Sequence, residues 1–460
     1  MNSPSRKGFD TYLLVSGFAL FAMFFGAGNL IFPFQVGVSG GANVIPAVIG
    51  VLLTGVLFPV AGMMAASTDA YGAGRIADRI GHIPGLILTV AVFLFCGMLY
   101  AMPRVATVSW EMAVRPLTSL GAQSGETAAN HVGLFIYSLI FFAIVLILLL
   151  VMIAIAMFKL PSVETLHPDP SYQASPFTAG LITGYGTMDA LASLVFGVVI
   201  ITQLHAHGYN EKRSVFRATT FTAGIAGASL AIVYTGLAFV GTRVADQEIA
   251  NPAAGLSLAA QMIFGPVGQI LFSIIVFLAC LTTATGLMGA STQYFCDLFP
   301  KVHRSTMLGI HVVVSLLVAN LGLENILAIV VTIGLATYPP AICLILIALL
   351  DYTMKRQLFW TYRLSAWVAT IIGIFEAIST FKLPAWENVS GWQQALQDVL
   401  HVLPLGSVQM GWLTPALAGV AVGIAIDLLH PVDVSKLPVS QTPTGIPDRN
   451  SETDDLPVEG

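Results

Sequence analysis

The stretch FFGAGNLIFP, residues 24–33, interrupts an apolar run that extends from about residue 11 to residue 37. Its two glycines weaken a helix through backbone entropy, and its proline lacks an N–H and clashes with the preceding turn. The hydrocarbon core of a bilayer has no water for free backbone groups, so a broken helix persists there only where it lines a cavity or a binding site. The stretch therefore predicts a broken membrane helix at a binding site. The alternative is a glycine packing notch with a proline kink.

The composition of the whole chain requires a membrane. Of its 460 residues, 56% are hydrophobic and 9% are charged, whereas soluble domains carry about 25% charged residues. The formal net charge is −5, and no basic domain suggests a nucleic acid partner. The four cysteines lie in or beside apolar runs, without the spacing of a metal motif or a disulfide framework. The sequence predicts an integral membrane protein without a cofactor, and it leaves the oligomeric state open.

Apolar runs of about 20 residues, the length of a membrane-spanning helix, recur along the chain. They cover about residues 11–37, 43–66, 83–105, 131–158, 178–204, 217–241, 267–290, 306–320, 323–350, 364–382 and 411–430. Connectors rich in lysine and arginine alternate with connectors that are poor in them, and the basic set is expected in the cytoplasm. This pattern predicts a multi-pass protein of the bacterial inner membrane with a cytoplasmic N-terminus. Residues 431–460 are polar and proline-rich, and we expect a disordered cytoplasmic tail there.

The run 131–158 conflicts with this alternation. The charge pattern requires an even number of crossings between residues 106 and 177, but a single helix of this run would be ~42 Å long. That length is long for one crossing and too short for two. Because no glycine, proline, asparagine or aspartate follows Gly133 in the run, no turn residue is available. We therefore expect one continuous helix, with a hairpin as the alternative.

A second interrupted segment lies in the other half of the chain. LITGYGTMDALASLVFG, residues 181–197, contains Gly184, Gly186 and Asp189 within an apolar run. Transporters built from inverted repeats carry a broken helix in each repeat, and an acidic residue within the membrane marks a functional site by default. The segment predicts a second broken helix at the same site. A solvated or structural role for Asp189 is the alternative.

A third signal is the threonine cluster in LACLTTATGLMG, residues 278–289. Ala279, Thr282 and Thr283 stand at i, i+3 and i+4, which is one face of a helix. One carbonyl and two hydroxyls on that face, opposite a broken helix, would form an oxygen cage for a hard monovalent cation. The alternative is that the threonine hydroxyls bond back to their own helix.

These three stretches together resemble the branched-chain amino acid:cation symporter family of bacteria, and the resemblance extends over most of residues 10–430. It implies uptake of leucine, isoleucine and valine driven by Na⁺, or by H⁺ in some members. It also implies an all-α polytopic membrane protein with the leucine-transporter-like inverted-repeat fold. Such a fold has two inverted five-helix repeats and two accessory helices, about 11–12 transmembrane helices in all, with helices 1 and 6 discontinuous.

The broken first helix of that wider fold carries a similar Gly-x-Gly-Asn motif, so functional residues can be transferred by position. Against the substrate the resemblance places the N–H groups of Ala27 and Gly28, for the carboxylate, and also Asn29, Tyr100, Gly184, Gly186 and Asp189. Around a sodium ion it places the carbonyls of Ala22, Phe25 and Ala279 and the hydroxyls of Thr282 and Thr283. Asn29 also matches a ligand of a second sodium site. Sodium is thus expected as the coupling ion.

The resemblance divides a single transmembrane domain, residues 1–430, into a first repeat of about 11–158, a second of about 178–350 and accessory helices of about 364–430. The run 131–158 departs from the family pattern, in which two helices are joined by a polar, basic connector. About 20 residues are absent from this chain by that comparison. The helix 4/5 region is therefore expected to be shortened, and a transport-defective member is an alternative function.

Two rival functions belong to other classes. A membrane enzyme needs clustered His, Asp or Glu, but the nine histidines are scattered. His205 and His207 flank a helix end, and Glu324 and Glu376 are isolated, which suggests structural or vestibule roles. A channel usually assembles its pore by symmetry, whereas two unlike broken helices in one chain favour alternating access. We therefore expect a carrier rather than an enzyme or a channel.

The expected substrate is a small branched apolar amino acid. The walls of the predicted site are rich in phenylalanine, isoleucine and valine, and we identify no buried basic residue that would hold an acidic side chain. A proton-coupled carrier, or one with a different neutral amino acid as substrate, is the alternative.

Overall fold

The computed structural model of the chain describes residues 11–68, 73–109, 149–160, 167–247, 249, 251–321, 323–354, 358–381 and 390–432. These residues contain helices and no strand. The helices before residue 110 are α1 (Thr11–Phe24), α2 (Ala27–Gly40), α3 (Val44–Leu52), α4 (Phe58–Ala66), α5 (Ala73–Asp78), α6 (His82–Leu94) and α7 (Ala101–Ser109). Short segments join some of them: η1 (Gly41–Asn43), η2 (Leu53–Leu57) and η3 (Phe95–Leu99).

The later helices are α10 (Pro170–Ala174), α11 (Pro176–Tyr185), α12 (Asp189–Ala206), α13 (Lys212–Thr242), α14 (Pro252–Leu298), α15 (Arg304–Ala319), α16 (Leu323–Thr353), α17 (Trp360–Thr380), α18 (Ser390–His401), η6 (Gly406–Val408) and α19 (Leu413–Leu429). Most of the later helices overlap the predicted apolar runs, while α10 and α18 lie between them. A further helix covers Leu149–Lys159. Residues 110–148 lie outside the described residues, so the prediction of one continuous helix over 131–158 stays a prediction. The predicted tail, from residue 433 onward, also lies outside them.

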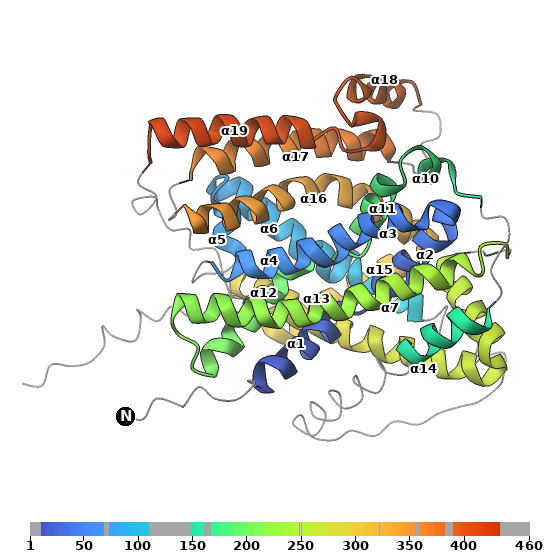
Figure 1. Cartoon of the computed structure of the whole chain (residues 1–460). Coiled ribbons are helices and arrows are strands. Elements are labelled where there is room, and N and C mark those ends of the chain that lie inside the picture. Colours follow the sequence, from blue (N-terminus) through green and yellow to red (C-terminus); the bar gives the residue numbers. More distant parts are fainter. Residues whose placement is uncertain are drawn as a thin grey trace, which may run out of the picture.

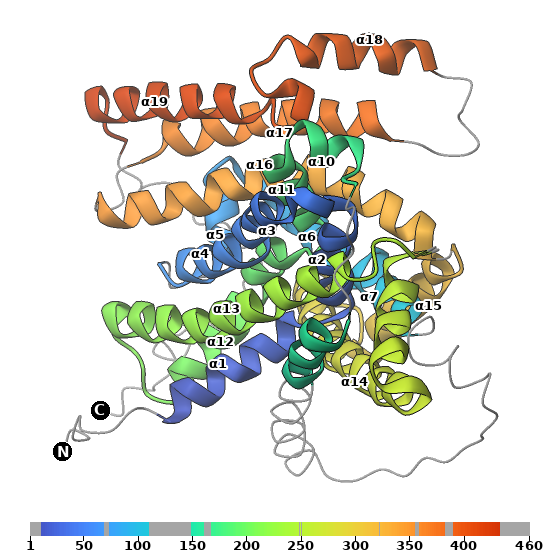
Figure 2. The same ribbon diagram turned by 45° about the vertical axis from the view of Figure 1, so that its right-hand side comes forward.

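The helices are stacked in layers (Figure 1). In two views, α17 and α19 lie along one edge of the molecule, α1 and α14 lie at the opposite edge, and α16, the α3–α4 pair and α13 lie between them (Figure 2). Helix α2 packs against α13, α3 against α11, and α4 against α12. Segments far apart in the sequence therefore meet in the interior, as a binding site built from two helix breaks requires.

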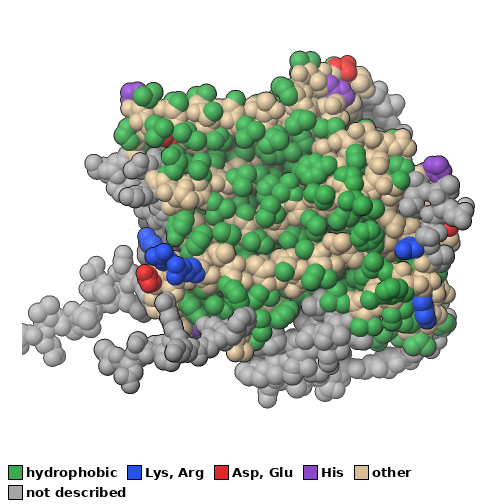
Figure 3. Space-filling view, in the orientation of Figure 1, with side chains coloured by type: hydrophobic (Ala, Val, Ile, Leu, Met, Phe, Trp, Pro, Cys, Tyr) green, Lys and Arg blue, Asp and Glu red, His purple; other side chains and the backbone are tan. Residues whose placement is uncertain are grey.

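The outer surface matches a bilayer rather than water. In the space-filling view the broad middle of one face is hydrophobic, while lysine and arginine side chains lie towards two opposite margins (Figure 3). Seven of the described helical stretches are long and apolar enough to cross a membrane, if α2 to α4 and α6 to α7 are each counted as one stretch. Four shorter apolar helices accompany them. The predicted polytopic, all-α fold is confirmed.

Two connectors between the predicted apolar runs, 242–266 and 383–410, contain helices. Within residues 242–266, α14 begins at Pro252, where the side chain of Asn251 accepts the N–H of Ala254 at 2.9 Å. Asparagine at the cap and proline in the first turn are favourable helix starts. The helix then bends at Gly265, whose φ is 64°. The connector 383–410 contains α18. Polar composition alone did not reveal these helices, because capping and packing supply their stability.

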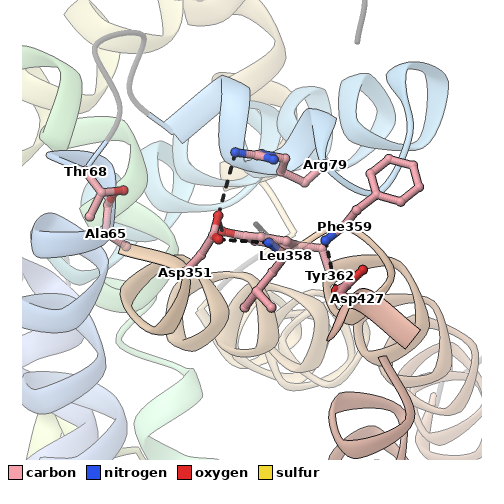
Figure 4. A network of polar contacts seen from close by, with 8 residues as sticks. All are labelled: Ala65, Thr68, Arg79, Asp351, Leu358, Phe359, Tyr362 and Asp427. Carbon is pink, nitrogen blue, oxygen red and sulfur yellow. Dashed lines mark hydrogen bonds and ion pairs between the residues drawn. The ribbon is translucent and has the colours of Figure 1, made fainter. Parts of the chain in front are cut away.

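A polar cluster joins three helices near the start of α17 (Figure 4). Asp427 of α19 accepts the N–H groups of Phe359, Trp360 and Thr361 at 3.0, 2.8 and 3.0 Å, and the Thr361 hydroxyl at 2.7 Å. A carboxylate in this place satisfies the free N–H groups of the helix start and complements the helix dipole.

The same cluster continues from α17 to α16 and the segment after α5. Asp351, near the end of α16, accepts the N–H of Leu358 at 3.1 Å and the Tyr362 hydroxyl at 3.4 Å. Its carboxylate also lies 3.7 Å from the guanidinium of Arg79. This cluster therefore fixes the helices α17 and α19 to the core of the protein.

We expect Asp427→Ala to destabilise the protein by ~2 kcal/mol or more, because hydrogen bonds to a charged group contribute ~1.5–3 kcal/mol each. The measurement is thermal unfolding of the purified protein in detergent. The matched control is Asp398→Ala on α18, because that carboxylate is exposed and accepts one side-chain hydrogen bond from Gln394. Equal unfolding temperatures for the two variants would contradict the role given to Asp427.

Candidate functional site

The first predicted helix break is confirmed between α1 and α2. Phe25 and Gly26 lie between the two helices, and Gly26 is extended, with φ −131° and ψ −161°. The N–H of Gly26 donates to Oδ1 of Asn29 at 3.2 Å, whereas in an unbroken helix it would donate to the carbonyl of Ala22. Ala22 and Phe25 are buried. The break thus places their carbonyls, both predicted sodium ligands, at the end of α1.

The second predicted break is confirmed between α11 and α12. Residues 186–188 leave the helical path, and Met188 is left-handed, with φ 65° and ψ 10°. A side chain other than glycine is uncommon in this region, and such strain is concentrated at functional sites. Asp189 begins α12 and is 2% exposed. The break therefore buries a carboxylate inside the membrane domain.

A buried hydrogen-bond network joins the two breaks. Nδ2 of Asn29 donates to Oδ2 of Asp189 at 2.7 Å. The hydroxyl of Tyr234, on α13, donates to the same carboxylate oxygen and accepts from the Asn29 amide. The sequence pointed to Asn29 and Asp189 separately, but it gave no signal for Tyr234. The structure brings all three together, so the two broken helices line one site.

The two glycines of the second break pack against neighbouring helices. A Cβ on Gly184 would lie 1.9 Å from Oγ1 of Thr54, and a Cβ on Gly186 would lie 2.3 Å from the Phe32 ring. These positions therefore require glycine for close packing against the segment η2 and helix α2. The carbonyl of Gly186 is in addition an acceptor inside the site.

The Gly186 carbonyl accepts from a residue that the sequence analysis missed. Nη1 of Arg104, on α7, donates to this carbonyl at 2.6 Å and to the hydroxyl of Tyr100 at 2.9 Å. Arg104 is 2% exposed. The expectation of a site without a buried basic residue is therefore wrong. An arginine inside an apolar run was the available signal, but an arginine near the end of such a run is also typical of a helix terminus at the interface.

A third interruption explains how Arg104 enters the site. Between α6 and α7 the chain passes through η3, where Gly97 has φ −98° and ψ −117° and Tyr100 has φ −139°. A Cβ on Gly97 would lie 2.3 Å from Oγ of Ser291 on α14, so glycine allows the two helices to approach closely here. The resulting bend starts α7 at Ala101 and leaves both Tyr100 and Arg104 buried.

The predicted sodium residues of α14 lie beside the first break, but their two hydroxyls differ. Oγ1 of Thr283 is buried without a hydrogen-bond partner among the described residues, and a Cβ on Gly26 would lie 2.7 Å from it. Oγ1 of Thr282 donates to the carbonyls of Ala279 at 3.0 Å and Leu278 at 3.3 Å, which is the alternative that the sequence left open. The Thr283 hydroxyl is therefore the stronger candidate for an ion ligand.

Beyond the breaks lies a cavity of about 520 Å³ between α11, α17 and the segment 397–409. It is lined in part by Phe32 of α2 and by Glu376 of α17. Oε1 of Glu376 accepts the N–H of Gly411 at 2.8 Å, so this carboxylate has a structural contact next to the cavity. Within the described residues, no group of three or more His, Cys, Asp or Glu side chains is arranged to hold a metal ion.

Comparison with known proteins agrees with this architecture. The family described as "Branched-chain amino acid transport protein" matches residues 10–150 and 145–430. The two matched parts meet inside the run 131–158, where the sequence predicted a shortened region. The chain is 35% identical over 437 residues to the branched-chain amino acid permease BrnQ of Corynebacterium glutamicum, with 90% of this chain and 95% of that protein covered.

Other relatives are similar over nearly their whole length. The branched-chain amino acid transport system 2 carrier protein of Pseudomonas aeruginosa is 35% identical over 451 residues, with 92% of this chain and 97% of the relative covered. The BrnQ permease of Escherichia coli is 33% identical over 442 residues, with 90% and 95% covered. These relatives are transport proteins, not enzymes.

A solved structure shows the same fold. Mhp1, a nucleobase-cation-symport-1 family transporter in a closed conformation, superposes with a TM-score of 0.53 at 15% identity, and 90% of this chain and 91% of that chain are covered. At this identity the likeness concerns the fold alone, and it supports a leucine-transporter-like membrane protein with helices 1 and 6 discontinuous. With the family match over most of its length, the chain belongs to the branched-chain amino acid transport protein family.

Proposed function

We propose that this protein imports leucine, isoleucine and valine across the bacterial inner membrane by sodium-coupled symport with alternating access. Its N-terminus lies in the cytoplasm in this proposal. The observation that carries it is the network of Asn29, Asp189 and Tyr234, which joins two helix breaks in the membrane interior. In transporters of this architecture, free N–H groups at such breaks bind anionic substrate groups, and free carbonyls bind cations.

The apolar surroundings of the first break support a branched apolar substrate. The Phe21 and Phe25 rings stack with centroids 5.1 Å apart, and the Phe24 ring meets the Phe196 ring edge-on at 5.3 Å. All four side chains are buried. Together with the names of the relatives, this environment favours an aliphatic side chain over a charged one.

Leucine uptake into proteoliposomes that contain the purified protein tests the proposal. We expect concentrative uptake with an inward Na⁺ gradient, and competition by isoleucine and valine but not by glutamate or lysine. Uptake driven by a proton gradient without Na⁺ would instead support the proton-coupled alternative. Binding without uptake would support a transport-defective protein.

The Thr283 hydroxyl is the proposed sodium ligand that mutation should reveal most clearly. Thr283→Val keeps the size of the side chain but removes an oxygen that has no hydrogen-bond partner among the described residues. We expect the Na⁺ concentration for half-maximal leucine uptake to rise about tenfold or more, equivalent to ~1.4 kcal/mol of lost ion binding. Thr283→Ser should restore the wild-type value.

The adjacent Thr282 supplies the matched control. Its hydroxyl already bonds to backbone carbonyls of its own helix, so Thr282→Val should raise the required Na⁺ concentration much less. If Thr283→Val leaves the Na⁺ dependence unchanged, the predicted sodium site is wrong, although leucine transport by another coupling would still stand.

A further inference from the structure

Among the described residues, the buried cation Arg104 has no anionic partner within ion-pair distance. Its described contacts are neutral: the carbonyl of Gly186, the hydroxyl of Tyr100, and the Tyr100 ring, whose centroid lies 4.7 Å from the guanidinium carbon. Its Nε is buried without a hydrogen-bond partner among the described residues. A buried charge is costly unless it is paired and fully hydrogen-bonded. The described residues therefore leave the guanidinium incompletely hydrogen-bonded, and an anionic ligand would complete its pairing.

The guanidinium lies against the first turn of α2. A Cβ on Gly28, the second residue of that helix, would lie 2.4 Å from Nη1 and 2.6 Å from Cζ of Arg104. The start of a helix carries free N–H groups and a partial positive charge. Two positive groups thus meet at this place, and an anion that contacts both would relieve their mutual repulsion.

The nearby carboxylate of Asp189 does not neutralise Arg104 directly. Its Oδ2 accepts from Asn29 and Tyr234, and the described residues place no carboxylate within ion-pair distance of the guanidinium. A buried positive group and a buried negative group are therefore held apart, each by neutral partners. A zwitterion, with a carboxylate and an ammonium on one carbon atom, is the ligand whose charges complement this arrangement.

We propose that Arg104 binds the α-carboxylate of the substrate, together with the N–H groups of Ala27 and Gly28. Guanidinium groups form paired, parallel hydrogen bonds with carboxylates, and the unpartnered Nε belongs to such a pair. The substrate ammonium then faces Asp189 and the Gly186 carbonyl. In this proposal Arg104 turns from that carbonyl towards the substrate carboxylate. This inference rests on the proposed function and extends it: the protein selects amino acids with a free carboxylate and rejects their amides, alcohols and amines.

The test compares leucine with leucinamide, which keeps the side chain and the ammonium but has a neutral carboxamide. Each ligand is titrated against the purified full-length protein in detergent, and its dissociation constant is obtained from the rise in unfolding temperature. In the wild type, leucine should bind about 100-fold more tightly than leucinamide, as expected for a buried charge pair. In Arg104→Gln, leucine should fall to the affinity of leucinamide, and leucinamide binding should stay within about threefold of wild type.

Two further arginine variants complete the comparison. Arg104→Lys keeps the charge but not the paired geometry, so it should bind leucine about tenfold more weakly than wild type and still prefer it to leucinamide. Arg243→Gln removes a partly buried arginine at the end of α13, whose Nη1 donates to the carbonyl of Leu160. It should keep the wild-type preference.

The outcomes separate binding from structure. If Arg104→Gln weakens both ligands equally, or keeps the wild-type preference, Arg104 is not the carboxylate ligand. If that variant does not fold, Arg104→Lys and the wild type test the role of Arg104 instead. Equal binding of leucine and leucinamide by the wild type would overturn the proposal. If the wild type binds no leucine, the assignment of leucine as the substrate fails. The amino acid that does bind is then compared with its own amide, and that comparison tests Arg104. If no amino acid binds, both proposals fall.

Discussion

Gly28→Leu is expected to abolish leucine binding and uptake while the protein still inserts into the membrane. The Cβ of any residue at this position would approach the Arg104 guanidinium to 2.4 Å, and a leucine side chain would extend further into the same space. Overpacking of this kind costs ~1–3 kcal/mol before any ligand is lost. The displaced guanidinium and the blocked start of α2 should then lower leucine affinity by about 100-fold or more. The measurements are leucine binding to purified protein and leucine uptake into proteoliposomes.

A glycine in open space provides the matched control. At Gly289 on α14, a Cβ would meet no atom within 4 Å, so Gly289→Leu should leave uptake near the wild-type rate. Gly28→Ala should weaken binding less than Gly28→Leu, because a flexible guanidinium yields to a single methyl group more readily than to an isobutyl group. Wild-type affinity in Gly28→Leu would show that FFGAGNLIFP is a packing notch and not a binding site.

The second large effect is expected for Asp189→Asn. The carboxylate accepts from the Asn29 amide and from the Tyr234 hydroxyl, and it is 2% exposed. An amide of the same shape removes the negative charge, and it keeps one oxygen as an acceptor for the Asn29 amide and the Tyr234 hydroxyl. Loss of one member of a buried, hydrogen-bonded charged set costs ~2–5 kcal/mol. We therefore expect leucine uptake to fall by about 100-fold or more, both with and without a Na⁺ gradient.

Two variants separate the charge of Asp189 from its structural contacts. Tyr234→Phe removes one hydrogen bond to the carboxylate but keeps its charge, so it should reduce uptake less than Asp189→Asn. Asp398→Asn changes an exposed carboxylate on α18 and should transport at the wild-type rate. If Asp189→Asn transports leucine normally, the carboxylate is only a link between the two helix breaks, and the ammonium of the substrate is bound elsewhere.

The sequence by itself determined two of the positions where helices break. Glycine and proline weaken a helix through their own backbone conformations, so their positions within an apolar run indicate where a helix is interrupted. The break at Phe25 and Gly26 and the break before Asp189 were therefore predicted, as were most of the membrane helices. An asparagine or aspartate within an apolar run costs free energy in the membrane and usually has a function. The sequence therefore predicts Asn29 and Asp189 as site residues.

Only the tertiary structure decided which of these groups meet. Asn29 contacts Asp189 across 160 positions and Tyr234 across 205. A tyrosine in the middle of a long apolar helix has no local feature that distinguishes it from a residue that faces lipid. The difference between Thr282 and Thr283 was equally hidden. Both lie on the predicted face. Only the packing of α14 against α1 leaves the Thr283 hydroxyl without a partner among the described residues, while the Thr282 hydroxyl bonds to its own helix.

Arg104 is the clearest example of a site residue that local sequence patterns do not identify. The sequence contains an arginine near the end of an apolar run, where a side chain would normally reach the aqueous interface. The bend at Gly97 to Tyr100 instead starts α7 in the interior and brings Arg104 to the carbonyl of Gly186, 82 positions away. Whether a charge at such a place is solvated or buried depends on which helices surround it. That is a property of the packed structure, because the free energy of a charge is set by the groups around it and not by its neighbours in the chain.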